Sequence, residues 1–215
     1  AKEIWVEVNK QMPWTYGPKF PDHKITKRIE VDYPLAEYSH DISDDEKDTL
    51  TKIGTYINQF ISEDCTIQLG ISKLQSTLQI KPKISVYSEM IGDWAMNLKA
   101  EKIISGFGMG SKSFYKWLDH NSKVELRPIG EITDPLSFAN IPNLVSINSA
   151  LEIDLFGQVA SESLDYKQIS GVGGSNDFTA GAAISKGGVS IIAMPSVTKD
   201  GKSKIVPKIQ NIVTI

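Results

Sequence analysis

The sequence has few of the residues that signal a disulfide framework, a metal site or a membrane segment. Its single cysteine, Cys65, excludes an internal disulfide and fits a reducing compartment. Its three histidines, His23, His40 and His120, lack the spacing of metal ligands. No apolar run approaches the roughly 20 residues of a transmembrane helix, and no signal peptide opens the chain. We therefore expect a cytoplasmic protein with no metal and no membrane partner.

The sequence also has little excess of positive or negative charge. The net charge of −3 and the dispersed basic residues give no general reason to bind nucleic acid. The one dense acidic run comprises Asp41, Asp44, Asp45 and Glu46, and such runs are typical of a solvated helix start. With 215 residues, of which 40% are hydrophobic, the chain can form one large globular domain, or one domain and part of another.

What is present is a regular succession of strand-like and helix-like stretches with short connections. This pattern is typical of a parallel α/β sheet flanked by helices. A capping box from Ser43 to Glu46 begins an amphipathic helix of about four turns. The other expected helices are 72–78, 90–98, 111–119 and 179–184. The expected strands are 66–69, 84–87, 103–106, 144–148, 151–155 and 190–194. The fold class is therefore α/β with a mainly parallel open sheet.

The first 45 residues differ from the rest. Residues 3–9 alternate like a strand, whereas residues 10–45 are rich in proline, aspartate and aromatics, with one short strand expected near 29–31. This composition indicates an extended connection between domains. We predict that residues 1–45 are the end of an N-terminal domain plus a linking arm. Residues 46–215 are predicted to form most of a catalytic C-terminal α/β domain.

Glu89 is the most prominent candidate for chemistry. It comes directly after the expected buried strand 84–87, and ligands of open α/β sheets bind at the carboxyl ends of the strands. A carboxylate at such a point can serve as a nucleophile, as a base, or only as a helix-capping acid. The local sequence leaves these three alternatives open.

Two glycine-rich stretches bear on the site. Residues 106–110 (GFGMG) lack the last glycine of a dinucleotide-binding loop, where Ser111 stands, and favour a strand-to-helix turn. Residues 171–178 (GVGGSNDF) precede a small-residue helix, and their glycines would let backbone N–H groups approach a ligand closely. The alternative for this second stretch is a turn that merely packs tightly.

Several segments, taken together and in order, resemble the acetyl-CoA hydrolase/4-hydroxybutyrate CoA-transferase family. The main ones are 87–91 (YSEMI), 147–159 (INSALEIDLFGQV) and 170–178 (SGVGGSNDF), and shorter matches lie at 68–71, 185–188 and 203–207. Family members are about twice as long. Neither their first portion nor their later Glu-Tyr-Gly segment has a counterpart here, so the resemblance implies an incomplete member with the class I-type CoA-transferase fold.

The resemblance also implies roles for particular residues. Glu89 would be the nucleophile that forms a glutamyl-CoA thioester, and the backbone amides of Ile71 and Gly174 would stabilise the oxyanions. Coenzyme A, as substrate, would contact Gly70, Thr133, Gly171, Gly173, Ser175 and Asp177. Thr133 stands where the family often has Asn. Glu152, on an alternating strand, is interpreted as a structural carboxylate or one that supports the site, and the alternative is that it is the nucleophile in place of Glu89.

The function that the resemblance implies is transfer of CoA between an acyl-CoA and a small carboxylate of the acetate, succinate or 4-hydroxybutyrate type. With water as acceptor, the same site would be an acyl-CoA hydrolase. A non-catalytic CoA-binding or assembly subunit, or an inactive fragment, is the alternative outside enzymes. We expect a homo-oligomer, or a partner chain that supplies the missing segments.

Overall fold

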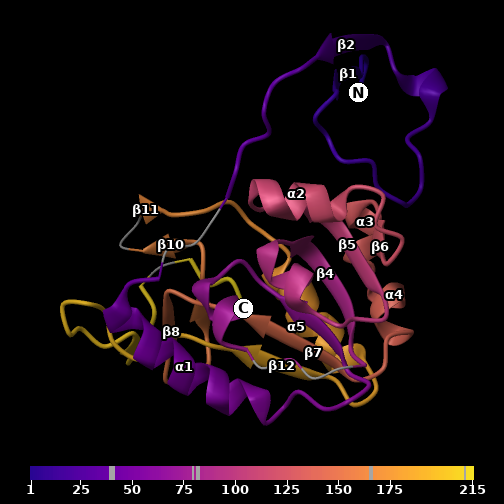
Figure 1. The fold of residues 1–215 in the computed structure, drawn as a ribbon. Coiled ribbons are helices and arrows are strands. Elements are labelled where there is room, and N and C mark those ends of the chain that lie inside the picture. The colour runs from indigo at the N-terminus through magenta and orange to yellow at the C-terminus, as the bar shows by residue number, and fades with distance from the viewer. Residues whose placement is uncertain (39–41, 79, 81–82, 165–166, 211) are drawn as a thin grey trace.

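Six parallel strands form the central sheet of the computed structural model, which describes residues 1–38, 42–78, 80, 83–164, 167–210 and 212–215 (Figure 1). Their spatial order is β12 (Val189–Ile192), β7 (Leu144–Asn148), β3 (Thr66–Leu69), β4 (Ser85–Ile91), β5 (Ile103–Gly108) and β6 (Val124–Leu126). Every pairing in this sheet is parallel. The predicted α/β class with a mainly parallel open sheet is confirmed.

Helices cover both faces of the sheet. Because strand side chains alternate between faces, neighbours such as Val86 and Tyr87 belong to two separate apolar clusters. The Val86 cluster is closed by α1 (Asp44–Asn58), α2 (Lys112–Leu118) and the 3₁₀ helices η2 (Lys73–Thr77) and η3 (Asp93–Asn97). The Tyr87 cluster is closed by α3 (Ile129–Ile132), α4 (Pro135–Ala139) and α5 (Ser175–Ile184).

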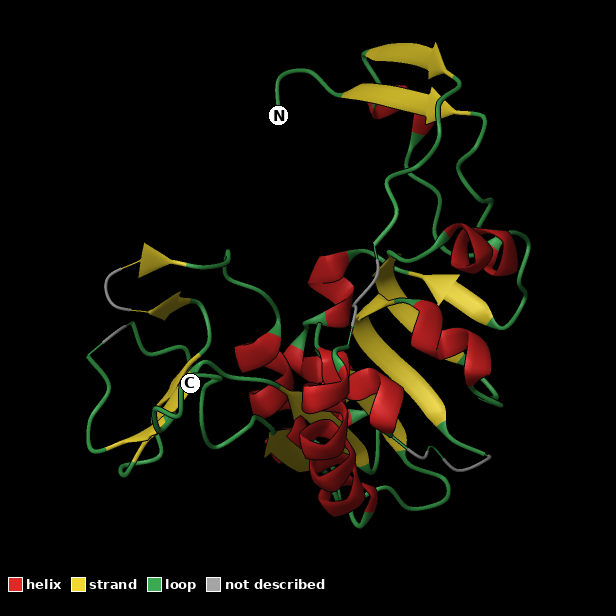
Figure 2. Ribbon diagram, turned by 60° about the vertical axis from the view of Figure 1, so that its left-hand side comes forward, coloured by secondary structure: helices red, strands yellow, loops and turns green. Residues whose placement is uncertain are grey.

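The remaining strands form small sheets outside this framework. The parallel pair β1 (Trp5–Asn9) and β2 (Lys27–Val31), with η1 (Asp22–Lys24) between them, stands apart from the central sheet (Figures 1 and 2). Two further small sheets follow β7. One contains β8 (Glu152–Asp154), β9 (Val159–Ala160) and β13 (Ile205–Val206), and the other contains β10 (Ser163–Leu164) and β11 (Lys167–Gln168).

The strand order creates a switch point beside β3. The chain runs from β3 outward through β4, β5 and β6, then returns to the other side of β3 for β7 and β12. The connections therefore leave the carboxyl ends of β3 and β7 in opposite directions. In open α/β sheets this is where a crevice forms and ligands bind.

The predicted helix over residues 90–98 is wrong. Met90 and Ile91 continue β4, where they pair with Phe107 and Gly108 of β5, and only η3 follows. The partner strand is likewise longer than the predicted 103–106. Pairing between two long neighbouring strands overrides the local preference of residues 90–91 for helix.

The predicted alternation of buried and exposed side chains over residues 151–155 is also reversed at Asp154 and Leu155. Asp154 is buried, and its carboxylate accepts hydrogen bonds from the N–H groups of Phe156, Gln158 and Ile209, while Leu155 is exposed. These backbone N–H groups need an acceptor, and for this reason the Asp154 side chain is buried where the apolar pattern predicts a buried Leu155.

Glu46 connects the start of α1 to η2, and it gives the first testable prediction. The predicted capping box is present, and Lys73 Nζ lies 2.8 Å from Glu46 Oε2. Hydrogen bonds from Lys73 and Ser43 lower the pKa of Glu46 to about 2. Since this is below the unfolded value of 4.5, the stabilisation is complete above that value and is lost as the pH falls toward 2.

We therefore expect Glu46→Gln to lower the midpoint of thermal unfolding at neutral pH. The difference from the wild type should shrink as the pH is lowered through the acid range, as measured by circular dichroism. Glu63→Gln is the matched control, because the exposed Glu63 has no ion pair within the described residues. A difference between Glu46→Gln and the wild type that stays constant at low pH would contradict the prediction.

Candidate active site

Glu89 lies within β4 rather than after it, which corrects the expectation that it leaves the strand. Strand β3 pairs with β4 only at Thr66–Ser85 and Ile67–Val86, so the last part of β4 extends beyond this pairing. On the other side, the Ser105 hydroxyl donates to the Glu89 carbonyl at 3.2 Å. The half-buried Glu89 is thus held by β5 along one edge and borders an open crevice along the other.

The Glu89 carboxylate meets the glycine-rich segment at the start of α5. The Gly174 N–H donates a hydrogen bond of 2.8 Å to Glu89 Oε2, and Gly174 is the N-cap of the helix. A Cβ atom on Gly174 would lie 2.6 Å from that oxygen, so only glycine permits this approach. The positive end of the helix dipole also favours a carboxylate at this position.

The opposite wall of the crevice is fixed by a buried polar network at the ends of β3 and β7. Gln68 Oε1 accepts hydrogen bonds from Asn148 Nδ2 at 3.0 Å and from the Ser146 hydroxyl at 2.8 Å. All three residues are buried. A Cβ atom on Gly70 would lie 2.5 Å from Asn148 Oδ1, so this network also requires a glycine where the chain leaves β3. The network therefore positions the turn at Gly70.

That turn orients the Ile71 amide. Gln75 Nε2 donates to the Gly70 carbonyl at 2.9 Å. Because the intervening peptide is trans, the Ile71 N–H points away from Gln75. Within the described part of the chain this N–H has no hydrogen-bond partner. It is therefore a donor that a ligand can use.

These elements enclose a cleft of about 530 Å³. The structure brings seven of the predicted site residues to its walls: Gly70, Ile71, Glu89, Gly171, Gly173, Gly174 and Ser175. They come from the end of β3, from β4 and from the segment before α5. Residues far apart in the sequence thus meet at the switch point of the sheet.

Two predicted site residues do not line this cleft. Thr133 ends α3, where its hydroxyl donates to the Ile129 carbonyl at 3.0 Å. Asp177 lies exposed in the first turn of α5. Glu152 is outside the cleft as well. Burial lowers the pKa of Lys204, and the nearby charge of Glu152 offsets part of this shift.

The cleft also contains polar residues that the sequence did not single out. Gln68 and Asn148 stand in buried strands that are mostly apolar, and that contrast was a usable signal. Glu162 gave no such signal. Its carbonyl accepts hydrogen bonds from the N–H groups of Ile169 (2.7 Å) and Ser170 (3.2 Å), which anchors the chain just before the glycine segment.

The described residues contain no group of three or more His, Cys, Asp and Glu side chains that could hold a metal ion. No helix within the described ranges is both long and apolar enough to cross a membrane.

In fold, this α/β chain is similar to a solved CoA-transferase. The 4-hydroxybutyrate CoA-transferase from Porphyromonas gingivalis is similar in structure, with a TM-score of 0.82 and 32% identity over 97% of this chain and 54% of that one. Residues 110–215 match the acetyl-CoA hydrolase/transferase C-terminal domain. Over residues 110–215 the chain therefore belongs to the acetyl-CoA hydrolase/transferase family, as its sequence motifs predicted.

Other relatives agree. The chain is 40% identical to the 4-hydroxybutyrate coenzyme A transferase of Clostridium kluyveri, over 96% of this chain and 52% of the relative. RipA from Yersinia pestis matches with a TM-score of 0.88 and 29% identity, over 100% of this chain and 52% of that one. The chain spans about half the length of the curated relatives that it matches.

Proposed function

We propose that this protein transfers CoA between an acyl-CoA and a small carboxylate, with Glu89 as the nucleophile. One observation carries the proposal: the Gly174 N–H lies 2.8 Å from Glu89 Oε2, in a cleft at the switch point of the sheet. The curated relatives are named as CoA-transferases of 4-hydroxybutyrate, of succinyl-CoA with cyclohexane-1-carboxylate, and of butyryl-CoA with acetate.

The reaction would proceed in two halves. A Glu89 oxygen attacks the thioester carbonyl and CoA leaves as a thiolate, which gives an acyl-glutamyl anhydride. The thiolate then attacks the glutamyl carbonyl and releases the first carboxylate, which leaves Glu89 as a CoA thioester. The acceptor carboxylate attacks this thioester, and the same two steps in reverse form the new acyl-CoA. No proton or electron is gained or lost, and the kinetics are ping-pong.

Each of these steps passes through a tetrahedral oxyanion. Two of them place the negative charge on an oxygen of Glu89 itself, and the Gly174 N–H already contacts that carboxylate. The unpartnered Ile71 N–H, on the facing turn, is the second donor in the proposal. Backbone donors fixed before the reaction stabilise such charge without reorganisation.

CoA would lie along the glycine segment. Gly171 and Gly173 line the cleft, and glycines let a pantetheine or phosphate group approach the backbone. Ser175 also lines it. Contacts of CoA with Thr133 and Asp177 remain predictions, since neither residue borders the cleft that contains Glu89.

Hydrolysis of acyl-CoA is the second candidate function. The family description includes hydrolases, and the half-buried position of Glu89 leaves the glutamyl thioester open to water. The two functions share every residue and differ in the acceptor. The ratio of CoA transferred to CoA released, with acetate present and absent, separates them.

The structure also bears on the partner. Aromatic side chains on the first 45 residues are exposed, among them Trp5, Trp14 and Phe20. We propose that residues 1–45 are the end of an N-terminal domain with its linking arm. A further part of the protein, a second copy or a partner chain would cover these side chains. A cytoplasmic location stays a prediction.

The covalent intermediate tests the proposed function directly. We expect an intact-mass shift of one CoA, less one water, when the protein is incubated with acetyl-CoA. The shift should map to the peptide containing Glu89 and should disappear when acetate is added. A protein that releases CoA steadily without ever carrying the adduct would rule out the glutamyl-thioester route.

A further inference from the structure

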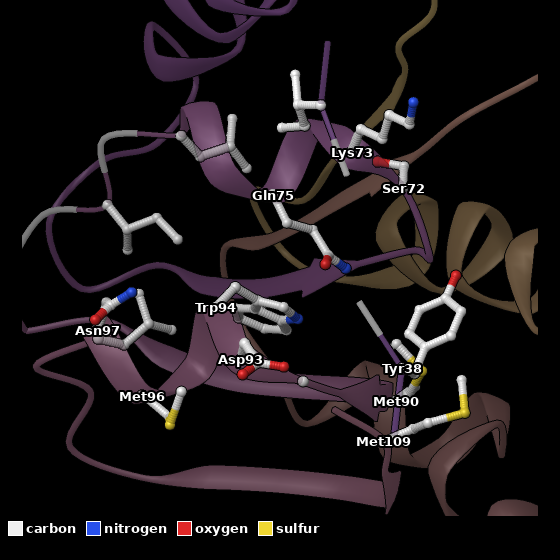
Figure 3. A pocket seen from close by; sticks show the side chains of 15 residues that line it. Tyr38, Ser72, Lys73, Gln75, Met90, Asp93, Trp94, Met96, Asn97 and Met109 are labelled. Carbon is white, nitrogen blue, oxygen red and sulfur yellow. The ribbon is translucent and has the colours of Figure 1, made fainter. Parts of the chain in front are cut away.

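A cavity of about 560 Å³ lies between α2 and the segments that follow β1 and β2. One wall is α2 with the turn after it, and the other is formed by residues 10–14, 34, 35 and 37. Among the described residues, its lining has none in common with the Glu89 cleft, nor with the cavity of about 510 Å³ between η2 and η3 that adjoins the cleft (Figure 3). We call this space the α2 cavity, and it is separate from the candidate active site.

Hydrogen bonds hold the two walls of the α2 cavity in place. The Tyr115 hydroxyl on α2 donates to the Ala36 carbonyl at 2.8 Å. At the end of the helix, the backbone N–H of Trp14 donates to Asp119 Oδ1 at 2.7 Å. The cavity is therefore formed before any ligand enters it, as small-molecule sites usually are.

The α2 cavity carries more positive than negative charge. Its lining includes three lysines, Lys10, Lys112 and Lys116, none of which forms an ion pair with a described residue. The two carboxylates of the lining, Glu37 and Asp119, accept backbone N–H groups instead. The ammonium groups are therefore available to an anion.

Two of these lysines share one face of the helix. Lys112 and Lys116 stand one turn apart on α2, and like charges at this spacing repel each other and destabilise a helix. Lys10 belongs to the opposite wall. An anion between the walls would remove the repulsion, and a phosphate group suits it, because its oxygens accept charge-assisted hydrogen bonds from ammonium groups.

The same cavity presents aromatic surface. The rings of Trp14 and His120 are stacked with their centroids 5.0 Å apart, yet Trp14 is still 45% exposed. Both residues line the cavity, and Tyr115 lines it from α2. Nucleotide bases stack on exposed rings of this kind. Aromatic surface beside unpaired lysines matches a ligand that combines a base with phosphates.

We propose that the α2 cavity binds a free purine nucleotide that carries two or more phosphates, with the base against Trp14 and the phosphates at Lys112 and Lys116. Its volume is within the range of about 300–1,000 Å³ that is typical of small-molecule sites. The inference does not rest on the proposed function, since the cavity and the Glu89 cleft are separate spaces. The adenosine end of CoA has the same chemistry, so the experiment must separate a free nucleotide from the substrate.

Calorimetric titration tests the ligand. We expect ATP to bind at least tenfold more tightly than adenosine, which lacks the charge, or tripolyphosphate, which lacks the base. The double variant Lys112→Gln/Lys116→Gln should bind ATP about tenfold more weakly, the scale of one charge-assisted hydrogen bond. Lys47→Gln/Lys52→Gln is the matched control, because it removes the same charge from exposed positions on α1. Equal affinity for ATP and tripolyphosphate, or equal weakening in both double variants, would overturn the proposal.

Two further measurements place the nucleotide. ATP should quench tryptophan fluorescence in the wild type and in Trp5→Phe, whose substitution lies on β1 outside the cavity, but not in Trp14→Phe. Saturating acetyl-CoA should leave the affinity for ATP unchanged. Displacement of ATP by acetyl-CoA would assign the cavity to the substrate, and quenching that persists in Trp14→Phe would remove the base from this site. Either result would refute the inference, whereas failure of the proposed function is recognised separately by the absence of a CoA adduct at Glu89.

Discussion

Glu89→Gln is expected to abolish the CoA adduct and to lower the rate of CoA transfer by roughly a thousandfold or more, the scale seen when a covalent nucleophile is removed. The amide keeps the size of the side chain, and its carbonyl oxygen can still accept the Gly174 hydrogen bond. What it lacks is the negatively charged oxygen that attacks the thioester. The loss should therefore appear in kcat while the protein remains folded.

Intact mass and CoA transfer to acetate are the measurements, with circular dichroism as the check on folding. Glu152→Gln is the matched control, because Glu152 lies outside the cleft and should retain the adduct and the rate. Absence of the adduct, with CoA released at the uncatalysed rate by both the wild type and Glu89→Gln, would remove Glu89 as the nucleophile. The remaining interpretation would then be a CoA-binding subunit without catalysis.

Gly174→Ala is expected to lower kcat about a hundredfold, in the range measured when one oxyanion donor is removed or a reacting group is displaced. The added Cβ would lie 2.6 Å from Glu89 Oε2 and 3.3 Å from Glu89 Cδ. The carboxylate must move away, which breaks the hydrogen bond from the Gly174 N–H. Both the position of the nucleophile and the stabilisation of its oxyanion are lost together.

Gly130→Ala, on α3 and outside the cleft, supplies the control. A Cβ atom there meets nothing within 4 Å, so the variant should keep its activity. Single-turnover formation of the glutamyl thioester, followed by mass, separates the two variants. If Gly174→Ala forms the thioester at the wild-type rate, the contact at 2.8 Å has no role in the chemistry, and the proposed oxyanion site is wrong.

Much of the framework followed from local patterns. The capping box of α1, the buried strands β3 and β7, and the helix α2 were predicted close to their observed bounds. Each depends on interactions within a few residues, or on burial that an apolar run reveals. The predictions that failed concern Glu89, residues 90–98 and Leu155, where a neighbouring strand or a set of buried donors decides the conformation.

The sequence by itself determined the α/β class, the family and the identity of the residues that carry the candidate chemistry. These follow from periodicity and from ordered motifs. Only the tertiary structure decided which groups meet. The contact between Glu89 and Gly174 joins residues 85 positions apart. It forms because β4 extends beyond the residues that pair with β3, and because α5 begins at the same edge of the sheet.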